Sequence, residues 1–200
     1  MRTDPPEWLY RRTRFFNILH LLRLTGPHSQ MIEDEKRCLQ KYAQKKSKAL
    51  EIGTYMGVSA SIIAKSLVEG GVVYCVDPYT GLDVCQEIAE RELKRNKVFE
   101  KTKLFKGFSS DEAIIKQIPT DLDFILVDGD HSYEGLKNDW KIVSERLVSN
   151  GIVCLHDTIT PEKEPWRNFG SVEYFNKIIM NDPGFELLES VFSMNVLRRK

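Results

Sequence analysis

The sequence predicts an α/β fold: a doubly wound, mostly parallel sheet that ends in an antiparallel hairpin and follows a helical lead-in. From residue 48 onward, short β-rich runs alternate with segments of helical periodicity, which is the pattern of a parallel sheet with crossover helices. At the C-terminus, FELLES (185–190) and SMNVLRR (193–199) are strand-like runs whose connection is too short for a crossover. These two runs should therefore pair antiparallel.

Residues 1–47 form the predicted helical lead-in, and residues 48–200 form the predicted main domain. Gly26 and Pro27 should separate two helices of the lead-in. Residues 8–24, WLYRRTRFFNILHLLRL, carry four arginines among aromatic and aliphatic side chains. Such an amphipathic helix suits packing on its own domain or on a second subunit of a homodimer, and less readily contact with a membrane surface.

Five segments of the main domain are predicted parallel strands, and all but the third are strongly apolar, as expected of strands covered on both faces. They are residues 48–53, 71–77, 102–107, 122–128 and 151–157. A helix should follow the fourth strand, because apolar residues recur there at three- and four-residue spacing from Tyr133 to Leu147. Residues 159–170 are predicted to form a loop, and residues 171–180 a helix.

Composition narrows the class of protein. A chain of 200 residues suits one sizeable domain, and its 29 basic and 29 acidic residues give no net field to attract nucleic acid. No apolar stretch approaches the ~18 residues of a membrane-spanning helix, and no signal peptide is recognisable. The four cysteines show no C-x-x-C spacing, which suggests a reducing, cytoplasmic setting.

The first predicted strand ends in a glycine turn, within LEIGTYMGVSAS (50–61), that contains Gly53 and Gly57. Glycines at this point let a ligand approach the backbone and the N-terminus of the next helix. The spacing is not G-x-G-x-x-G, and Tyr55 would crowd a pyrophosphate, so a dinucleotide is disfavoured. The next strand ends in Asp77, whose carboxylate can accept both hydroxyls of a ribose. Together these features indicate an adenosine-containing ligand without a diphosphate.

Three stretches, EIGTYMGVS, VDPY and VDGDH, resemble the cofactor motifs of class I S-adenosylmethionine-dependent methyltransferases. The resemblance is greatest to the small O-methyltransferases related to the catechol and caffeoyl-CoA enzymes. VDGDHSYEGLKNDW together with LHDT further resembles the subgroup often encoded with sugar and natural-product pathways. The resemblance covers roughly residues 30 to 200 and implies a seven-stranded sheet whose last strand is antiparallel.

The resemblance also implies a cofactor site. Around the methionine part it places Glu51, Gly53, Tyr55 and Ser59, and at the ribose it places Asp77. Ser109 and Ser110 would lie beside the adenine. Either serine suits the N-cap of the following helix equally well, with Asp111 and Glu112 favouring the helix start.

Two predicted strands end in carboxylates. If the strands are ordered as in that family, Asp128 and Asp157 lie about 5 Å apart on the ligand side, one strand spacing. Two carboxylates this close need a positive group between them, and Mg²⁺ or another divalent cation with oxygen ligands would serve. In the metal-dependent O-methyltransferases similar positions bind the metal, but here Thr158 replaces the expected asparagine ligand.

Other groups near these carboxylates can complete a metal shell or act as a base. His156, Asp130 and His131 are the candidate additional ligands. His131 stands where the catechol-type enzymes have a lysine, and a neutral imidazole takes a proton near pH 7, so His131 is the candidate general base, with Asp128 beside it. The alternative is structural: His131 and Ser132 open a helix that Asp130 caps.

The leading hypothesis is therefore methyl transfer from S-adenosylmethionine to a hydroxyl of a small molecule: a sugar, a phenol or a natural product. Trp166, Arg167 and Phe169 of the 159–170 loop are the candidate walls of the acceptor site. The alternatives are a non-catalytic binding or scaffold protein on the same fold and, less favoured, a nicotinamide-dependent oxidoreductase. Methylation of nucleic acid is disfavoured by the neutral net charge.

Overall fold

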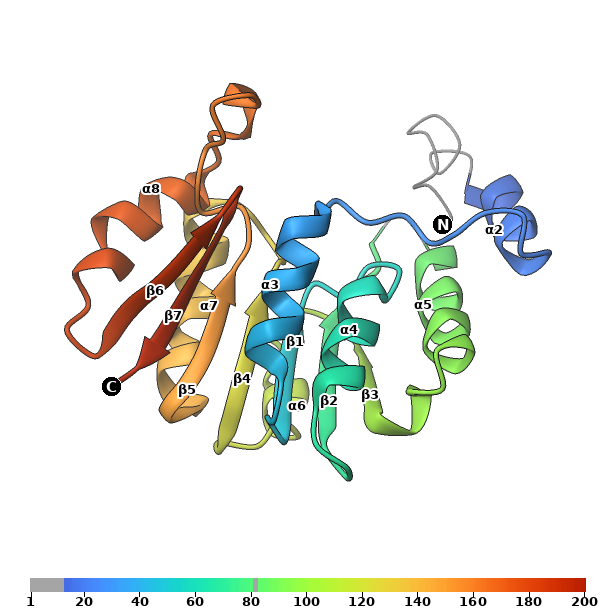
Figure 1. Cartoon of the computed structure of the whole chain (residues 1–200), viewed down its shortest axis with the longest axis horizontal. Coiled ribbons are helices and arrows are strands. Elements are labelled where there is room, and N and C mark those ends of the chain that lie inside the picture. The colour runs from blue at the N-terminus through green and yellow to red at the C-terminus, as the bar shows by residue number, and fades with distance from the viewer. Residues whose placement is uncertain (1–12, 81–82) are drawn as a thin grey trace.

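The computed structural model describes residues 13–80 and 83–200, and its centre is a seven-stranded sheet in the order β3-β2-β1-β4-β5-β7-β6 (Figure 1). The strands are β1 Lys48–Ile52, β2 Val72–Asp77, β3 Thr102–Lys106, β4 Leu122–Val127, β5 Leu147–Leu155, β6 Phe185–Val191 and β7 Met194–Arg199. The first five strands run parallel, and β7 pairs antiparallel with both β5 and β6. The predicted sheet and its terminal hairpin are confirmed.

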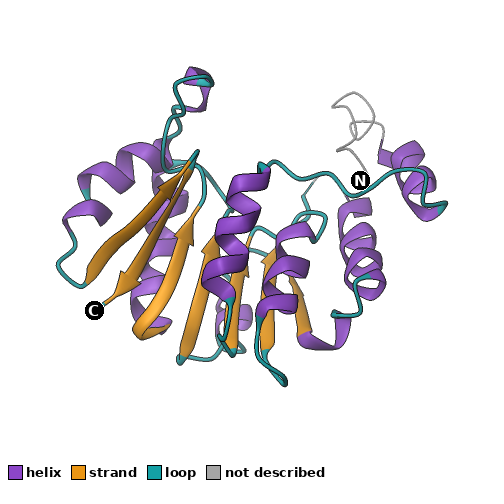
Figure 2. Cartoon of the chain, in the orientation of Figure 1, coloured by secondary structure: helices purple, strands orange, loops and turns teal. Residues whose placement is uncertain are grey.

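Helices cover both faces of this sheet (Figure 2). The described helices are α2 Thr13–Leu21, α3 Glu33–Ala43, α4 Val58–Ser66, α5 Asp83–Arg95, α6 Glu112–Ile115, α7 Tyr133–Arg146 and α8 Gly170–Lys177. Neighbouring residues of β1 point to opposite sides, so that Leu50 enters the core under α7 and α8, whereas Ala49 enters the core under α3 and α4. This two-sided burial explains why the strands are apolar at nearly every position.

Most predicted boundaries differ from the structure by one or two residues, and a few differ by more. Strand β5 begins at Leu147, before the predicted residue 151, and the helix that was expected to include Leu147 ends at Arg146. Helix α8 ends at Lys177, and a short 3₁₀ turn, Ile179–Asn181, follows it. The predicted 159–170 loop contains one 3₁₀ turn, Pro165–Arg167.

Helix α2 belongs to the amphipathic segment 8–24, of which residues 8–12 lie outside the described part of the chain. Its buried side chains, Phe16 and His20, face α5, where Arg91 and Arg95 contact the imidazole of His20. The described part of the segment therefore packs on its own domain. Phe15, Ile18, Leu21, Leu22 and Leu24 are exposed. Contact of this segment with a second subunit or a membrane stays a prediction.

The lead-in is joined to the main domain through α3, which follows the predicted break at Gly26 and Pro27. Leu39 and Ala43 of α3 are fully buried in the same core as α4. All four cysteines are buried free thiols. Over residues 13–80 and 83–200, every helix is too short or too polar to cross a membrane.

Candidate functional site

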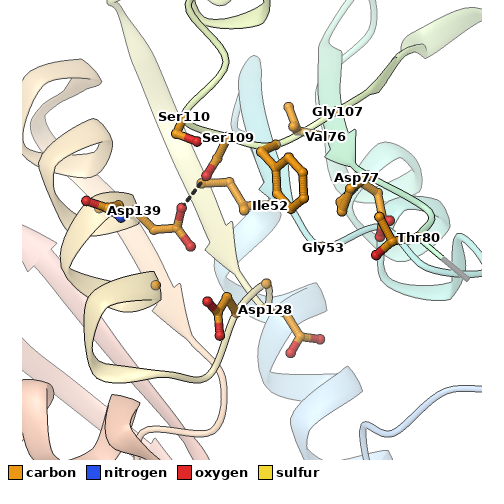
Figure 3. Close-up of a pocket in the computed structure, with 16 residues that line it drawn as sticks. Ile52, Gly53, Val76, Asp77, Thr80, Gly107, Ser109, Ser110, Asp128 and Asp139 are labelled. Atoms are coloured by element: carbon orange, nitrogen blue, oxygen red, sulfur yellow. Dashed lines mark hydrogen bonds between the residues drawn. The ribbon is translucent and has the colours of Figure 1, made fainter.

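Two adjoining cavities lie beyond the carboxyl ends of β1, β2 and β4, where ligands bind in open parallel sheets. The first cavity, of about 390 Å³, extends from Asp77 past Ile52 to Ser109 and Asp139 (Figure 3). The second, of about 460 Å³, lies on the side of the lead-in and includes His28 to Met31. Both are lined by Gly53, Asp77 and Asp128, so they form two parts of one site.

The turn after β1 depends on Gly53. Its φ is +93°, and a Cβ there would lie 2.0 Å from the carbonyl oxygen of Asp128. A side chain at this position would therefore collide with the loop that follows β4. Gly57 is different: it precedes α4 with φ +78°, approaches Ala89 of α5, and lines neither cavity. Its role in the structure is helix entry and packing.

Asp77 connects the loops that follow β1 and β2. One carboxylate oxygen accepts a hydrogen bond from the backbone N–H of Tyr55 at 2.7 Å, and the other accepts one from Tyr79 at 2.7 Å. Both tyrosines have positive φ, +47° and +49°, which is costly for a residue with a side chain. The contacts with Asp77 hold this strained backbone, and the carboxylate remains at the junction of the two cavities.

Glu51 lies inside the protein, immediately before this turn. Its side chain is fully buried, and neither carboxylate oxygen has a hydrogen-bond partner among the described residues. Burial raises the pKa of Glu51 to about 8, and the nearby hydroxyls of Ser59 and Thr54 offset only part of that effect. Glu51 lines neither cavity, whereas Ser59 and Tyr55 line the second one.

Ser109 and Ser110 line the first cavity. Neither caps a helix: the N-cap of α6 is Asp111, whose carboxylate accepts a hydrogen bond from the backbone of Phe108. The Ser109 hydroxyl instead donates to Asp139 Oδ1 at 2.5 Å. Asp139 was not among the predicted site residues, although its position on the cavity side of α7, next to the buried Trp140, was a usable signal.

Asp128, His131 and Asp157 converge at the end of β4 and β5. One ligand atom from each lies within 4.8 Å of the others, and Asp128 and His131 also line the second cavity. Oxygen and imidazole donors in this arrangement fit a divalent cation. His131 Nε2 is 3.4 Å from Asp157 Oδ2, and its ring stacks on Phe169 at 5.3 Å between centroids. The helix start is capped by Ser132, with Asp130 accepting hydrogen bonds from that serine.

His156 lies behind these groups, surrounded by carboxylates. Its Nδ1 is 3.0 Å from Asp128 Oδ1 and 3.6 Å from Asp157 Oδ2, and its Nε2 is 3.4 Å from Glu35 Oε2. Burial alone would lower the pKa of His156, but Asp128, Asp157 and Glu35 raise it well above the usual range. The three carboxylates favour the imidazolium form of His156, and His156 lies outside the group of ligand atoms that Asp128, His131 and Asp157 bring together.

Asp157 has a second cationic partner. Arg167, from the loop after β5, binds Asp157 Oδ1 through its Nε at 3.0 Å and also through Nη2. Burial opposes ionisation of Asp157, yet His156, His131 and Arg167 together hold the pKa of this carboxyl well below its usual range. Asp157 also has φ +53°, a third strained residue at the ligand edge of the sheet. Thr158, in the place of the expected asparagine, is buried and bonds the backbone of Leu155.

Glu35 was missed by the sequence reasoning. It lies in α3, is fully buried, and accepts hydrogen bonds at Oε1 from the backbone N–H and the hydroxyl of Ser193, in the β6–β7 turn. Burial raises the pKa of Glu35, but His156, Ser193 and the backbone of Ile32 together lower it by more, so the net shift is downward. No local signal marks a glutamate in a charged helix as buried, because its partners are far away in the sequence.

A comparison with protein families matches residues 50–158 to a methyltransferase domain. The chain belongs to this methyltransferase family. The matched range begins in β1, before the glycine turn, and ends just after Asp157, so it contains the strand ends beside both cavities. A curated relative, an uncharacterised protein of Acanthamoeba polyphaga mimivirus, is 28% identical over 116 residues, or 54% of this methyltransferase and 50% of the relative. This methyltransferase thus matches only about half the length of that protein.

Solved structures share the fold of this methyltransferase. An O-methyltransferase from Bacillus cereus in complex with SAH superposes with a TM-score of 0.69 at 18% identity, covering 98% of this chain and 92% of that one. TomG, an O-methyltransferase of tomaymycin synthesis from Streptomyces achromogenes in complex with SAM, gives 0.69 at 14% identity, covering 98% and 91%. At these identities the likeness establishes the fold alone.

Proposed function

We propose that this methyltransferase transfers the methyl group of S-adenosylmethionine to a hydroxyl oxygen of a small molecule. The observation that supports this most is the shared edge of the two cavities. Gly53, Asp77 and Asp128 line both, so a ligand bound in the first cavity reaches the groups of the second, where Asp128 and His131 lie. The two O-methyltransferases with this fold were solved with SAH or SAM, which supports the same cofactor.

The cavity walls suggest how the cofactor would lie. Asp77, Ser109 and Ser110 line the first cavity, where Asp77 would offer its carboxylate to the ribose hydroxyls and the two serines would lie beside the adenine. Tyr55 and Ser59 would surround the methionine part in the second cavity. When bound, the cofactor supplies an electrophilic methyl group on its sulfonium. The remaining task of the protein is to align a hydroxyl behind that methyl and to accept its proton.

His131 is the proposed general base. With Nε2 directed at Asp157, the ring can keep Nδ1 available for the proton of the acceptor. The Asp157 carboxylate would stabilise the imidazolium that forms, and Arg167 and His156 hold that carboxylate in place. Phe169 fixes the ring plane by stacking. Proton acceptance by a residue positioned in this way contributes about 10²–10⁴-fold to a rate.

A divalent cation such as Mg²⁺ is a second part of the proposal. Asp128 and Asp157 would hold it, and a bound cation would lower the pKa of an acceptor hydroxyl. His131 belongs to the same group of donors. A neutral imidazole has one unprotonated nitrogen, which cannot both bind a metal and accept a proton. Its two roles therefore exclude each other, and activity in a chelator distinguishes them.

The acceptor would enter beside the 159–170 loop. Trp166 is 72% exposed and Phe169 stacks on His131, so aromatic walls are available for a sugar or phenol ring. Arg167 is not available as a clamp for an anionic acceptor, because Asp157 and Glu164 both bind its guanidinium. We therefore propose a neutral hydroxylated acceptor of the sugar, phenol or natural-product classes.

Calorimetric titration with S-adenosylmethionine, SAH and NAD tests this proposal. We expect the first two to bind in a chelating buffer and NAD not to bind. Methyl transfer to a panel of sugars and phenols is then measured in EDTA and in Mg²⁺. Activity retained in EDTA supports His131 as base, and activity that requires Mg²⁺ supports His131 as a ligand. A protein that binds neither S-adenosylmethionine nor SAH would overturn the proposal and favour a non-catalytic binding protein.

A further inference from the structure

The first cavity contains a buried carboxylate, Asp139, that the proposed function does not yet use. Asp139 projects from α7 and is only 3% exposed, yet it lines the cavity. Figure 3 shows it reaching toward Ser109, with Ile52 beside the pair. A carboxylate in such a position must find donors, because an ionised group is costly to bury without them.

Within the described part of the chain, only one of its two oxygens has a hydrogen-bond partner. The Ser109 hydroxyl donates to Oδ1 at 2.5 Å, and Oδ2 accepts no hydrogen bond from any residue that the structure describes. Burial raises the pKa of Asp139 to about 6, with Ser109 acting in the opposite direction and Asp130 adding to the rise. The carboxylate is thus mainly ionised at neutral pH, and it acts only as an acceptor in that form.

The rest of the cavity indicates which donor Oδ2 would meet. Asp77 and Thr80 lie at the end that suits a ribose, and Ile52 and Val76 provide an apolar surface for a flat ring. Ser109 and Asp139 close the opposite side (Figure 3). A nucleoside whose sugar meets Asp77 would therefore direct the edge of its base toward Asp139.

We propose that Asp139 accepts a hydrogen bond from the exocyclic amino group of the cofactor's adenine, and so selects a 6-aminopurine. This inference rests on the proposed function, because it assumes a nucleoside in the first cavity. Ser109 acts as a positioning residue, since its hydroxyl occupies Oδ1 and leaves Oδ2 for the ligand. If Asp139 served only to anchor Ser109, loss of the amino group from the ligand would change affinity little.

The test compares SAH with its analogue that carries hydrogen in place of the 6-amino group, by calorimetric titration of the full chain. The wild-type protein should bind SAH about 10- to 100-fold more tightly, as expected for one hydrogen bond to a charged group. In Asp139→Leu this ratio should fall toward one, because the acceptor is gone. In Asp139→Asn part of the ratio should remain, since the amide oxygen still accepts.

Asp130→Asn is the matched control, because Asp130 lines the same cavity but its carboxylate is bonded to Ser132. This variant removes the same charge and should keep the wild-type ratio. Equal affinity of the wild-type protein for both ligands would overturn the inference without any variant, so the test does not depend on whether Asp139→Leu folds. An unchanged ratio in a folded Asp139→Leu would also overturn it. Absence of SAH binding would instead contradict the proposed function.

Discussion

The imidazole of His156 lies between Asp128 and Glu35, with Nδ1 3.0 Å from Asp128 Oδ1 and Nε2 3.4 Å from Glu35 Oε2. Asp128 and Asp157 follow the neighbouring strands β4 and β5, and their carboxylates repel each other unless a positive group lies between them. Here the protein supplies that charge from its own side chains: His156, just after the end of β5, and Arg167, from the loop that follows. The ligand edge of the sheet therefore does not depend on a metal for its charge balance.

Replacement of His156 should be strongly destabilising. His156→Gln removes the cation and leaves Glu35 and Asp157 buried without it, so we expect a loss of about 3–5 kcal/mol in the free energy of unfolding. Urea denaturation measures this loss. The double variant Glu35→Gln/His156→Gln removes one of the stranded charges and should recover part of the stability. Equal stability of wild type and His156→Gln would contradict the ion-pair description.

Glu51 should make stability dependent on pH. Its pKa is about 8 in the folded state against 4.5 as the ordinary value, so the folded protein retains a proton that the unfolded chain releases between these values. The contribution of Glu51 to the free energy of unfolding is fully present below about pH 4.5 and is lost as the pH rises toward 8. Glu51→Gln stays neutral at every pH, and at pH 9 we expect it to be more stable than wild type by about 2–5 kcal/mol. Thermal unfolding from pH 6 to 9 gives the difference, and parallel curves would show that Glu51 is ionised in the folded state.

A side chain at position 53 should disrupt the ligand edge. In Gly53→Ala the new Cβ would lie 2.0 Å from the Asp128 carbonyl, so β1 or the loop after β4 must move, at a cost of roughly 3 kcal/mol or more. Gly70→Ala is a matched control, because Gly70 also has a positive φ, +74°, but no other described residue comes within 4 Å of its Cβ position. That variant should lose only about 1 kcal/mol. Similar losses in the two variants would show that backbone strain, and not the collision, determines the requirement at Gly53.

His131→Gln should lower kcat about 10²–10⁴-fold and leave the affinity for SAH close to that of wild type. Steady-state rates and SAH titration on the same preparation give both values. A fall in kcat of less than about fivefold would assign the base to another residue.

The fold could be predicted from the sequence because its signals are local. Each parallel strand is a short apolar run, and the short connection before β7 leaves only antiparallel pairing. Leu147 shows where local signals become ambiguous: it continues the apolar stripe of α7 by four residues from Val143, but the chain turns at Leu147 and β5 begins there. Pairing of Leu147 with Leu122 in the sheet decides the outcome, and that contact is not visible from spacing.

The site was predictable where its residues end strands. Asp77, Asp128 and Asp157 follow apolar runs, and parallel topology brings their strand ends to one edge. The partners of these groups were not predictable in the same way. Glu35 meets Ser193 across 158 positions of the sequence, and the guanidinium of Arg167, which binds Asp157, also lies 5.8 Å from the ring of Phe192 in the β6–β7 turn. Roles that depend on such distant pairs need the assembled chain.

The position of Glu35 also determines how this protein can be divided. The predicted lead-in ends at residue 47, yet Glu35 of α3 lies 3.4 Å from His156, which follows β5. Glu35 also accepts a hydrogen bond from Ser193 in the β6–β7 turn. A truncation or a chimera joined at residue 48 would therefore leave the imidazole of His156 without one of its carboxylates and Ser193 without its acceptor. In a chimera made from two related proteins, α3, β5 and the β6–β7 turn should therefore all come from the same parent.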